Sequence, residues 1–388
     1  MRVLICGIDG YIGWSLALHL AKIGHEVYGI DNFSRRSNVA HMGSWSAIPI
    51  LEIEDRIRAC KEHLNLNIHF VRGDLRDYET LGKLLTDAKP ESIVHLGEQP
   101  SAPFSMIDRQ HALDTQENNV IGTLNLLFAI KEFCRDAHLI KLGTMGEYGT
   151  PNIDIPEGFF EVEFRNRRDF LPFPRQANSF YHWSKVHDSG NVMFACRIWN
   201  LRSTDIMQGV VYGTRIPEFV DDSLLTRFDF DEAFGTAINR FCAQSVIGFP
   251  LTLYGKGNQK RGFIALVDSV QCLTLAIENP PKPGEYRVFN QLDEVYNLYQ
   301  LAEIVVNTQK KFGLKSEILP LANPRLEMED HYYKVDNHHL RNLGFKPTHS
   351  LTQEIEIMFE DLLKYKERIE AKRKIISPTI DWRNGKVG

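Results

Sequence analysis

The sequence predicts an α/β fold in which a doubly wound parallel sheet is followed by a smaller C-terminal α/β region. Short apolar runs alternate with amphipathic helical patterns through the first half of the 388 residues, which is typical of parallel sheets with helices on both faces. Three glycines at regular spacing come directly after the first apolar run. We expect residues 1–206 to form the sheet domain and residues 207–388 to form mainly the second region, with some of that chain returning to the sheet.

The first strand and the glycines after it predict a dinucleotide-binding turn. Residues 3–6 form a short apolar run that indicates a buried parallel strand. Gly7, Gly10 and Gly13 follow at once, and residues 14–23 have helical periodicity. Such a strand, tight turn and helix start hold a pyrophosphate on backbone N–H groups and on the positive end of the helix. The sheet is therefore predicted to be a Rossmann sheet.

The residue that ends the second predicted strand indicates which dinucleotide binds. Asp31 follows the apolar residues 26–30 and stands about 20 residues beyond the glycines, where such folds place the acid that binds the ribose hydroxyls. A carboxylate there repels a 2′-phosphate and so favours NAD over NADP. Arg35 and Arg36 support the alternative, because arginines just past the strand can accept that phosphate. Asp31 decides the prediction in favour of NAD.

Two long connections interrupt the alternation of strands and helices. Residues 38–67 exceed what a simple crossover needs, and residues 50–64 have one apolar face at helical spacing, so we expect an inserted helix that covers one edge of the sheet. Residues 150–178 are rich in proline and aromatic residues. We interpret them as a flap or hairpin over the site, with a plain surface loop as the alternative. The remaining strands are expected at residues 68–71, 91–96 and 139–142, and a further helix at residues 119–133.

Tyr181 and Lys185 form a candidate catalytic pair. Residues four apart lie on one face of a helix, so the ammonium can stand beside the phenol. A phenol is a poor base at neutral pH, and a neighbouring cation favours the phenolate. Such a base can take the proton of a sugar hydroxyl while its carbon loses hydride. This spacing alone is common on ordinary amphipathic helices, so the catalytic interpretation depends on the other motifs of the chain.

These motifs, together with Asp74 and Thr144 at predicted strand ends, resemble the extended short-chain dehydrogenase/reductase superfamily, which includes nucleotide-sugar epimerases and dehydratases. Within it, the chain resembles the UDP-sulfoquinovose synthase family over nearly its whole length. The most specific part is the run Thr-Met-Gly-Glu-Tyr-Gly-Thr-Pro-Asn-Ile-Asp at residues 144–154. Further segments that carry the resemblance are residues 97–99, 101–103, 105–109, 179–188, 208–213, 234–242, 254–257, 287–291 and 331–333.

The resemblance implies a reaction on UDP-glucose with NAD as cofactor and sulfite as second substrate. Oxidation at C4 would give a 4-keto sugar whose acidified C5 hydrogen allows water to be lost across C5 and C6. Sulfite would then add at C6, and reduction at C4 would give UDP-sulfoquinovose. A UDP-glucose 4-epimerase, or another NAD-dependent nucleotide-sugar epimerase or dehydratase, is the alternative enzyme. A non-catalytic NAD(H)-binding sensor is the alternative of another class, although an intact Thr144, Tyr181 and Lys185 argue against it.

The chain departs from the dehydratases of this superfamily at the residues for acid–base chemistry. Those enzymes place an Asp-Glu pair directly after the threonine, whereas this chain has Met145 and Gly146, with Glu147 one place on. The roles of Met145, Glu147 and His182 are therefore open. Glu147 is either catalytic or a solvated loop carboxylate. His182 is either a core imidazole or a donor for the loss of water or for sulfite.

The resemblance also implies the residues that bind the ligands. Arg240, Arg261 and Arg325 are candidates for the two UDP phosphates, because a guanidinium fork matches phosphate oxygens. The other residues expected at the substrate are Gln99, Thr144, Gln208, Thr236 and Tyr254. The residues expected at the cofactor are Gly7, Asp9, Gly10, Tyr11, Ile12, Gly13, Asp31, Asn32, Ser34, Arg35, Asp74, Leu75, Leu96, Gly97, Gln99, Asn118, Tyr181 and Lys185.

Composition limits the partners and the location of the protein. A net charge of −5 implies no general attraction to nucleic acid or to a membrane. The six cysteines have no metal-ligand spacing, so we expect reduced thiols, no metal site and a cytoplasmic enzyme. No signal peptide or membrane-spanning run is predicted. A homodimer is the default for the superfamily, and a protein that donates sulfite is a further expected partner. Whether the sulfosugar enters a lipid or a glycan is left open.

Overall fold

The computed structural model describes residues 1–325, 330–383 and 385–386. Its centre is a seven-stranded sheet with the order β12-β8-β5-β4-β1-β2-β3, and every neighbouring pair in it is parallel. The chain reverses its direction of winding at β1, which lies between β4 and β2. The predicted doubly wound fold class is thereby confirmed. The strands are β1 Arg2–Cys6, β2 Glu26–Asp31, β3 Ile68–Arg72, β4 Ser92–His95, β5 His138–Thr144, β8 Arg202–Gln208 and β12 Tyr286–Gln291.

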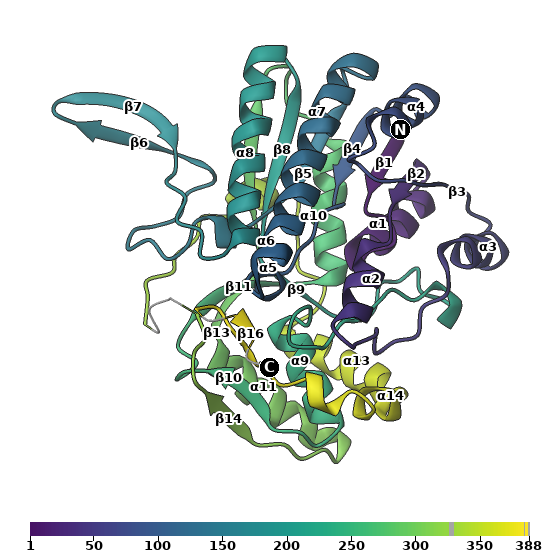
Figure 1. Cartoon of the computed structure of the whole chain (residues 1–388), viewed down its shortest axis with the longest axis vertical. Helices are drawn as coiled ribbons and strands as arrows, with labels where there is room; N and C mark the ends of the chain where they lie inside the picture. Colours follow the sequence, from purple (N-terminus) through teal and green to yellow (C-terminus); the bar gives the residue numbers. More distant parts are fainter. Residues whose placement is uncertain (326–329, 384, 387–388) are drawn as a thin grey trace.

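Helices cover both faces of this sheet (Figure 1). Alternate residues of β1 point to opposite faces, so Val3 belongs to the core beneath α1 and α10, and Leu4 belongs to the core beneath α4, α7 and α8. This two-sided burial explains why the strands are continuous apolar runs. The covering helices are α1 Tyr11–Lys22 and α10 Leu266–Glu278 on one face, and α4 Tyr78–Ala88, α7 Gly122–Phe133 and α8 Phe180–Trp199 on the other.

The second region lies at the end of the sheet where the strands have their carboxyl ends (Figure 1). It shares one apolar core with the α1 side of the sheet, and β12 returns from it to form an edge of the main sheet. One of its sheets contains β9 Val210–Tyr212, β11 Lys260–Ala265 and β13 Glu294–Asn297. Another contains β10 Leu251–Tyr254 and β14 Ile318–Leu321. Its helices are α9 Ala237–Val246, α11 Leu298–Gln309, α12 His338–Asn342, α13 Leu351–Leu363 and α14 Lys366–Glu370, and the short strands β15 Ile380–Asp381 and β16 Gly385–Lys386 follow.

The connection after β2 contains α2 Ser34–His41 and α3 Ile53–Leu64, and α3 is the helix predicted at residues 50–64. Its side chain Arg56 is completely buried and forms an ion pair with Asp9 of the glycine turn. The Arg56 guanidinium also lies 4.4 Å from the ring centre of Trp14 in α1. The insertion is therefore fixed to the turn that the sequence assigns to the cofactor. The remaining helices of the first half are α5 Ala102–Ser105 and α6 Arg109–Gln116.

The connection before α8 forms a hairpin, but the prediction that it covers the site is wrong. Strands β6 Phe159–Phe164 and β7 Arg167–Pro172 pair in antiparallel fashion. Figure 1 shows this hairpin extending away from the body of the molecule, and every residue of β7 is exposed. Only the ends of the connection, at Gly149, Thr150 and Asn178, reach the cavity described below.

Replacement of Arg56 by Met should lower the free energy of unfolding by about 3 kcal/mol, because buried Asp9 loses a cation and Trp14 loses its guanidinium contact. Denaturation in urea measures the effect. The matched control is Arg58→Met on the same helix, whose side chain is 67% exposed and whose loss should cost less than about 0.5 kcal/mol. Equal effects of the two substitutions would contradict the role given to Arg56.

Candidate active site

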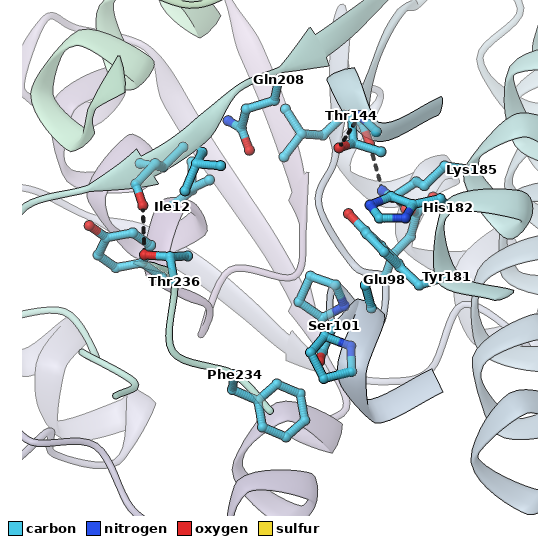
Figure 2. Close-up of a pocket in the computed structure, with 18 of the residues that line it drawn as sticks. Ile12, Glu98, Ser101, Thr144, Tyr181, His182, Lys185, Gln208, Phe234 and Thr236 are labelled. Atoms are coloured by element: carbon cyan, nitrogen blue, oxygen red, sulfur yellow. Dashed lines mark hydrogen bonds and ion pairs between the residues drawn. The ribbon is translucent and has the colours of Figure 1, made fainter. Parts of the chain in front are cut away.

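A cavity of about 440 Å³ lies between the carboxyl ends of the sheet strands and the second region. Ligands of open α/β sheets bind at this edge, next to the strand where the winding reverses. The cavity wall contains the end of β1, the start of α1, the ends of β4 and β5, the first turns of α8 and the segment 232–237. Figure 2 shows Thr144, Tyr181, His182 and Lys185 on one side of this space and Phe234 and Thr236 on the other.

The glycine turn after β1 leaves no room for a side chain at Gly7 or Gly13. A Cβ atom at Gly13 would lie 2.1 Å from the carbonyl oxygen of Gly7, and one at Gly7 would lie 2.7 Å from the backbone of Leu96. Gly7 also has a φ of +85°, which side chains rarely adopt. No side chain caps the start of α1, so its first N–H groups are left for a ligand. The turn therefore fits the pyrophosphate of a dinucleotide.

Asp31 lies at the end of β2, on the cavity wall. Its two carboxylate oxygens accept N–H bonds of 2.8 Å from Asp9 and Phe33, which fix the carboxylate where a ribose would bind. The two arginines that supported NADP are engaged elsewhere. Arg35 binds Asp229 at 2.8 Å and Arg36 binds Asp9 at 2.7 Å. Because both guanidinium groups are already paired, the geometry favours a ribose hydroxyl over a 2′-phosphate.

Thr144, Tyr181 and Lys185 meet at the end of β5. Ser179 caps α8 by accepting the N–H of His182 at 3.2 Å, and this cap sets the direction of the first helical turn. The Lys185 ammonium donates to the carbonyl of Leu142 at 2.6 Å. It also forms an ion pair with Glu98, a buried cavity residue that the sequence analysis missed. The signals for Glu98 were its place just after the fourth strand and its presence in the segment 97–99, which carries the family resemblance.

The expectation that Lys185 lowers the pKa of the Tyr181 phenol does not hold in the ligand-free protein. Burial raises the pKa of Tyr181, and the negative charge of Glu147 raises it further. The Lys185 nitrogen lies 5.9 Å from the Tyr181 ring centre, and its charge is balanced by Glu98. The phenol is therefore protonated at neutral pH until a ligand changes the local charge.

Glu147 is neither a solvated loop carboxylate nor a residue of the cavity wall. It is completely buried behind Thr144, where it accepts the backbone N–H of Thr144 at 3.2 Å and the hydroxyl of Ser189 at 2.9 Å. The Lys141 ammonium lies 3.4 Å from it. This placement differs from both expectations for Glu147, which were a catalytic residue of the site and a solvated loop carboxylate. Its carboxylate binds the backbone of Thr144 and the hydroxyl of Ser189 in α8, and it does not line the cavity.

His182 fills the space that a side chain at residue 146 would need. A Cβ atom at Gly146 would lie 2.4 Å from Nε2 and Cδ2 of the His182 ring, so glycine at this position makes room for the imidazole. The ring's Nδ1 lies 2.9 Å from the hydroxyl of Ser179. Burial lowers the pKa of His182 to about 3, and the charges of Arg325 and Arg261 lower it as well. The imidazole is therefore neutral at neutral pH.

The wall that faces these residues carries the three predicted phosphate ligands, Arg240, Arg261 and Arg325. Tyr254 lies beside two of them, with its ring centre 6.0 Å from the Arg240 guanidinium carbon and 5.4 Å from that of Arg325. Burial lowers the pKa of Arg240, which remains charged because an arginine pKa is so high. A cluster of three cations in one wall suits a diphosphate.

All but three of the predicted site residues line the cavity. The exceptions are Glu147, Asp9 and Gln99. The Asp9 carboxylate is held by Arg36 and Arg56, and the Gln99 side chain donates to Thr115 at 2.8 Å, so both side chains support the site from behind. Cavity residues that the sequence analysis missed include Glu98, Ser101, Thr150, Asn178, Phe234, Tyr333 and Trp382.

Comparison with known proteins places the chain in a family. Residues 3–291 match the NAD dependent epimerase/dehydratase family. A UDP-sulfoquinovose synthase of Sulfolobus acidocaldarius is 48% identical over 99% of this chain and 98% of its own length. The chain belongs to the UDP-sulfoquinovose synthases. The chloroplastic UDP-sulfoquinovose synthase of Spinacia oleracea is 49% identical over 98% of this chain and 79% of its own length.

Solved structures agree with the fold of this UDP-sulfoquinovose synthase. The UDP-glucose 4-epimerase of Thermotoga maritima, solved with UDP-glucose, has a TM-score of 0.71 at 21% identity and covers 94% of this chain and 99% of its own. The UDP-glucuronic acid 4-epimerase of Bacillus cereus, solved with UDP-glucuronic acid and NAD, has a TM-score of 0.70 at 22% identity with the same coverage. The cofactor of the synthase is NAD, as predicted. Across the described ranges, no helix is long and apolar enough to cross a membrane.

The Gly146→Ala substitution should displace the His182 ring, because the added methyl group would overlap it. We expect turnover to fall by about 10²-fold, the usual scale for a lost proton-transfer group, with little change in the melting temperature. The control is Gly190→Ala on the exposed side of α8, where an added Cβ atom meets no neighbour within 4 Å. Wild-type turnover in Gly146→Ala would contradict the placement of His182.

Proposed function

We propose that this site converts UDP-glucose and sulfite into UDP-sulfoquinovose by C4 oxidation, loss of water across C5 and C6, addition of sulfite at C6 and reduction at C4. The observation that carries this proposal is the imidazole of His182, which stands in the space left by Gly146 beside Thr144 and Tyr181. It gives a member of this family a proton-transfer group for elimination at the place where the usual acidic pair is missing.

Thr144, Tyr181 and Lys185 serve the oxidation and the reduction at C4. The glycine turn and Asp31 would hold NAD, which would supply a hydride acceptor and donor for C4 and a positive charge that favours the ionised phenol. Tyr181 takes the proton of the C4 hydroxyl, while the Thr144 hydroxyl hydrogen-bonds the same oxygen. Lys185 is fixed by Leu142 and Glu98 at 5.9 Å from the Tyr181 ring centre. Its charge, which Glu98 balances in the ligand-free protein, favours the ionised phenol only in the complex.

His182 serves the elimination. If its Nδ1–H donates to the Ser179 hydroxyl, its Nε2 carries the lone pair and can accept the C5 proton. The charges of Arg325 and Arg261, which help to lower the pKa of His182, are neutralised when a diphosphate binds them. The imidazole therefore becomes more basic in the substrate complex. Met145, only 5% exposed on the cavity wall, keeps water from competing with sulfite for the alkene.

The three arginines opposite these residues bind the diphosphate of the substrate, and Gln208 and Thr236 contact the sugar or the uridine. We also propose a homodimer through α7 and α8, which contact each other. Their outer faces expose Phe128, Phe194 and Ile198 at 42%, 54% and 57%, which is costly for a monomer. A cytoplasmic location and a protein that donates sulfite remain predictions from the sequence.

The function is tested by mass analysis of the products from UDP-glucose with and without sulfite. We expect UDP-sulfoquinovose only with sulfite, and slow incorporation of deuterium at C5 from heavy water without it. His182→Ala should slow this exchange by about 10²-fold, whereas His187→Ala, exposed on the same helix, should not. UDP-galactose as the product would support an epimerase, and the absence of any product or exchange would support a sensor.

Tyr181→Phe should lower turnover by about 10³-fold, because it removes the proton acceptor for the C4 hydroxyl. It changes little buried area, so the dissociation constant for UDP-glucose, measured by calorimetry on the NAD-bound enzyme, should stay within about twofold. Turnover near the wild-type rate would rule out Tyr181 as the base. A large loss of affinity would instead assign it to substrate binding.

A further inference from the structure

The C-terminal segment reaches the cavity at Trp382. This side chain lines the cavity wall although it stands only six residues from the end of the chain. The segment before it is attached to the 232–237 wall, because the backbone N–H and the hydroxyl of Thr379 both donate to Glu232, at 2.5 and 2.8 Å. Ile380, 4% exposed, packs with Phe234 of the same wall. Trp382 is therefore held at a defined place.

Trp382 lies against Arg325, one of the arginines that face the catalytic residues. The Arg325 guanidinium carbon is 4.7 Å from the Trp382 ring centre and 5.4 Å from that of Tyr254. The buried Nε of Arg325 has no hydrogen-bond partner. Within residues 1–325, 330–383 and 385–386, no carboxylate forms an ion pair with it. Arg325 is thus held by two aromatic rings.

Another arginine of the cavity differs from Arg325 in that a carboxylate balances its charge. Arg35 also lies on an aromatic ring, 4.1 Å from the centre of Phe234, but its charge is balanced by Asp229 at 2.8 Å. An aromatic face attracts a guanidinium through its quadrupole without adding a negative charge. Two rings can therefore fix Arg325 in one orientation while its positive charge stays available to an anion.

We propose that Trp382 is a positioning residue for the nucleotide, which holds the Arg325 guanidinium toward the diphosphate of the UDP-sugar. This rests on the proposed function only in taking a nucleoside diphosphate as the ligand of this wall. Because the ring orders a long, flexible side chain before the ligand arrives, binding loses less conformational entropy. A residue close to the end of the described chain is in this way part of the binding site.

The test is calorimetric titration of the NAD-bound full-length enzyme with UDP and with uridine. Trp382→Leu keeps an apolar side chain but removes the aromatic face, and it should weaken UDP binding by about 3- to 30-fold. Trp382→Phe, which keeps a ring, should restore most of the affinity. Uridine binding should not change. Equal weakening of UDP and uridine would overturn the proposal, since it would place Trp382 on the base.

Two further variants separate this role from general packing. Trp45 lies outside the cavity and carries the Arg368 guanidinium 5.0 Å from its ring centre, so Trp45→Leu is a matched control that should leave UDP affinity unchanged. In an Arg325→Ala background, Trp382→Leu should have no additional effect on UDP binding. Additive losses would contradict action through Arg325. The titrations need neither sulfite nor turnover, so their outcome is independent of the overall reaction.

With turnover established, the same variants separate binding from chemistry. Trp382→Leu should raise the KM for UDP-glucose by about the factor found for UDP and leave kcat within about twofold. A fall in kcat with an unchanged KM would also overturn the proposal. Melting curves show which variants fold, and the Phe variant keeps the test decisive if the Leu variant is unstable.

Discussion

The buried ammonium of Lys141 is the interaction on which the catalytic residues depend. It lies in β5 and is completely inaccessible to solvent. A charge at such depth costs several kcal/mol unless it is fully paired. It donates to the Ser189 hydroxyl at 2.8 Å and to the Lys185 carbonyl at 3.1 Å, and it lies 3.4 Å from both Glu147 and Asp205. These partners belong to α8, to the turn after β5 and to β8, so pairing the charge fixes these elements relative to one another. This cluster therefore sets the distance between Thr144 and Tyr181.

The cations on the two sides of the cavity thus differ in how they are held in place. Behind the catalytic wall, cations are paired with carboxylates, and their role is to hold backbone elements in place. On the opposite wall, Arg325 is oriented by aromatic rings, and no carboxylate of the described residues forms an ion pair with it. Paired charges give rigidity, and accessible charges give affinity for an anion. The glycine turn follows the same division, since Asp9 is paired from behind and the N–H groups at the start of α1 face the cofactor space.

Sequence patterns predicted those parts of the site that are set by local structure. The glycine turn, the place of Asp31 at the end of β2, and the presence of both Tyr181 and Lys185 at the cavity follow from turn sterics, strand ends and helical spacing, all within a few residues. What failed depends on contacts between distant segments. The sequence left Glu147 as either a catalytic residue or a solvated loop carboxylate, because its partners Lys141 and Ser189 become neighbours only when β5 and α8 assemble. The direction of the β6–β7 hairpin and the arrival of Trp382 in the cavity are likewise tertiary properties. Local periodicity carries no information about them.

His182 connects the two walls. Its pKa is depressed by burial and by the cations across the cavity, so in the ligand-free protein the imidazole is neutral and only weakly basic. A diphosphate that neutralises those cations removes part of the depression while leaving the ring in place beside Gly146. The chemistry at C5 would then be enabled by the binding of the nucleotide some distance away, with no movement of the backbone. An acidic side chain at residue 146 would respond in the same direction, because the unneutralised arginines would stabilise its carboxylate and lower its basicity until the diphosphate is bound. The imidazole differs because its unprotonated form is neutral. Burial therefore costs this form little free energy, and the ring stays uncharged and desolvated beside Met145 until the substrate is bound.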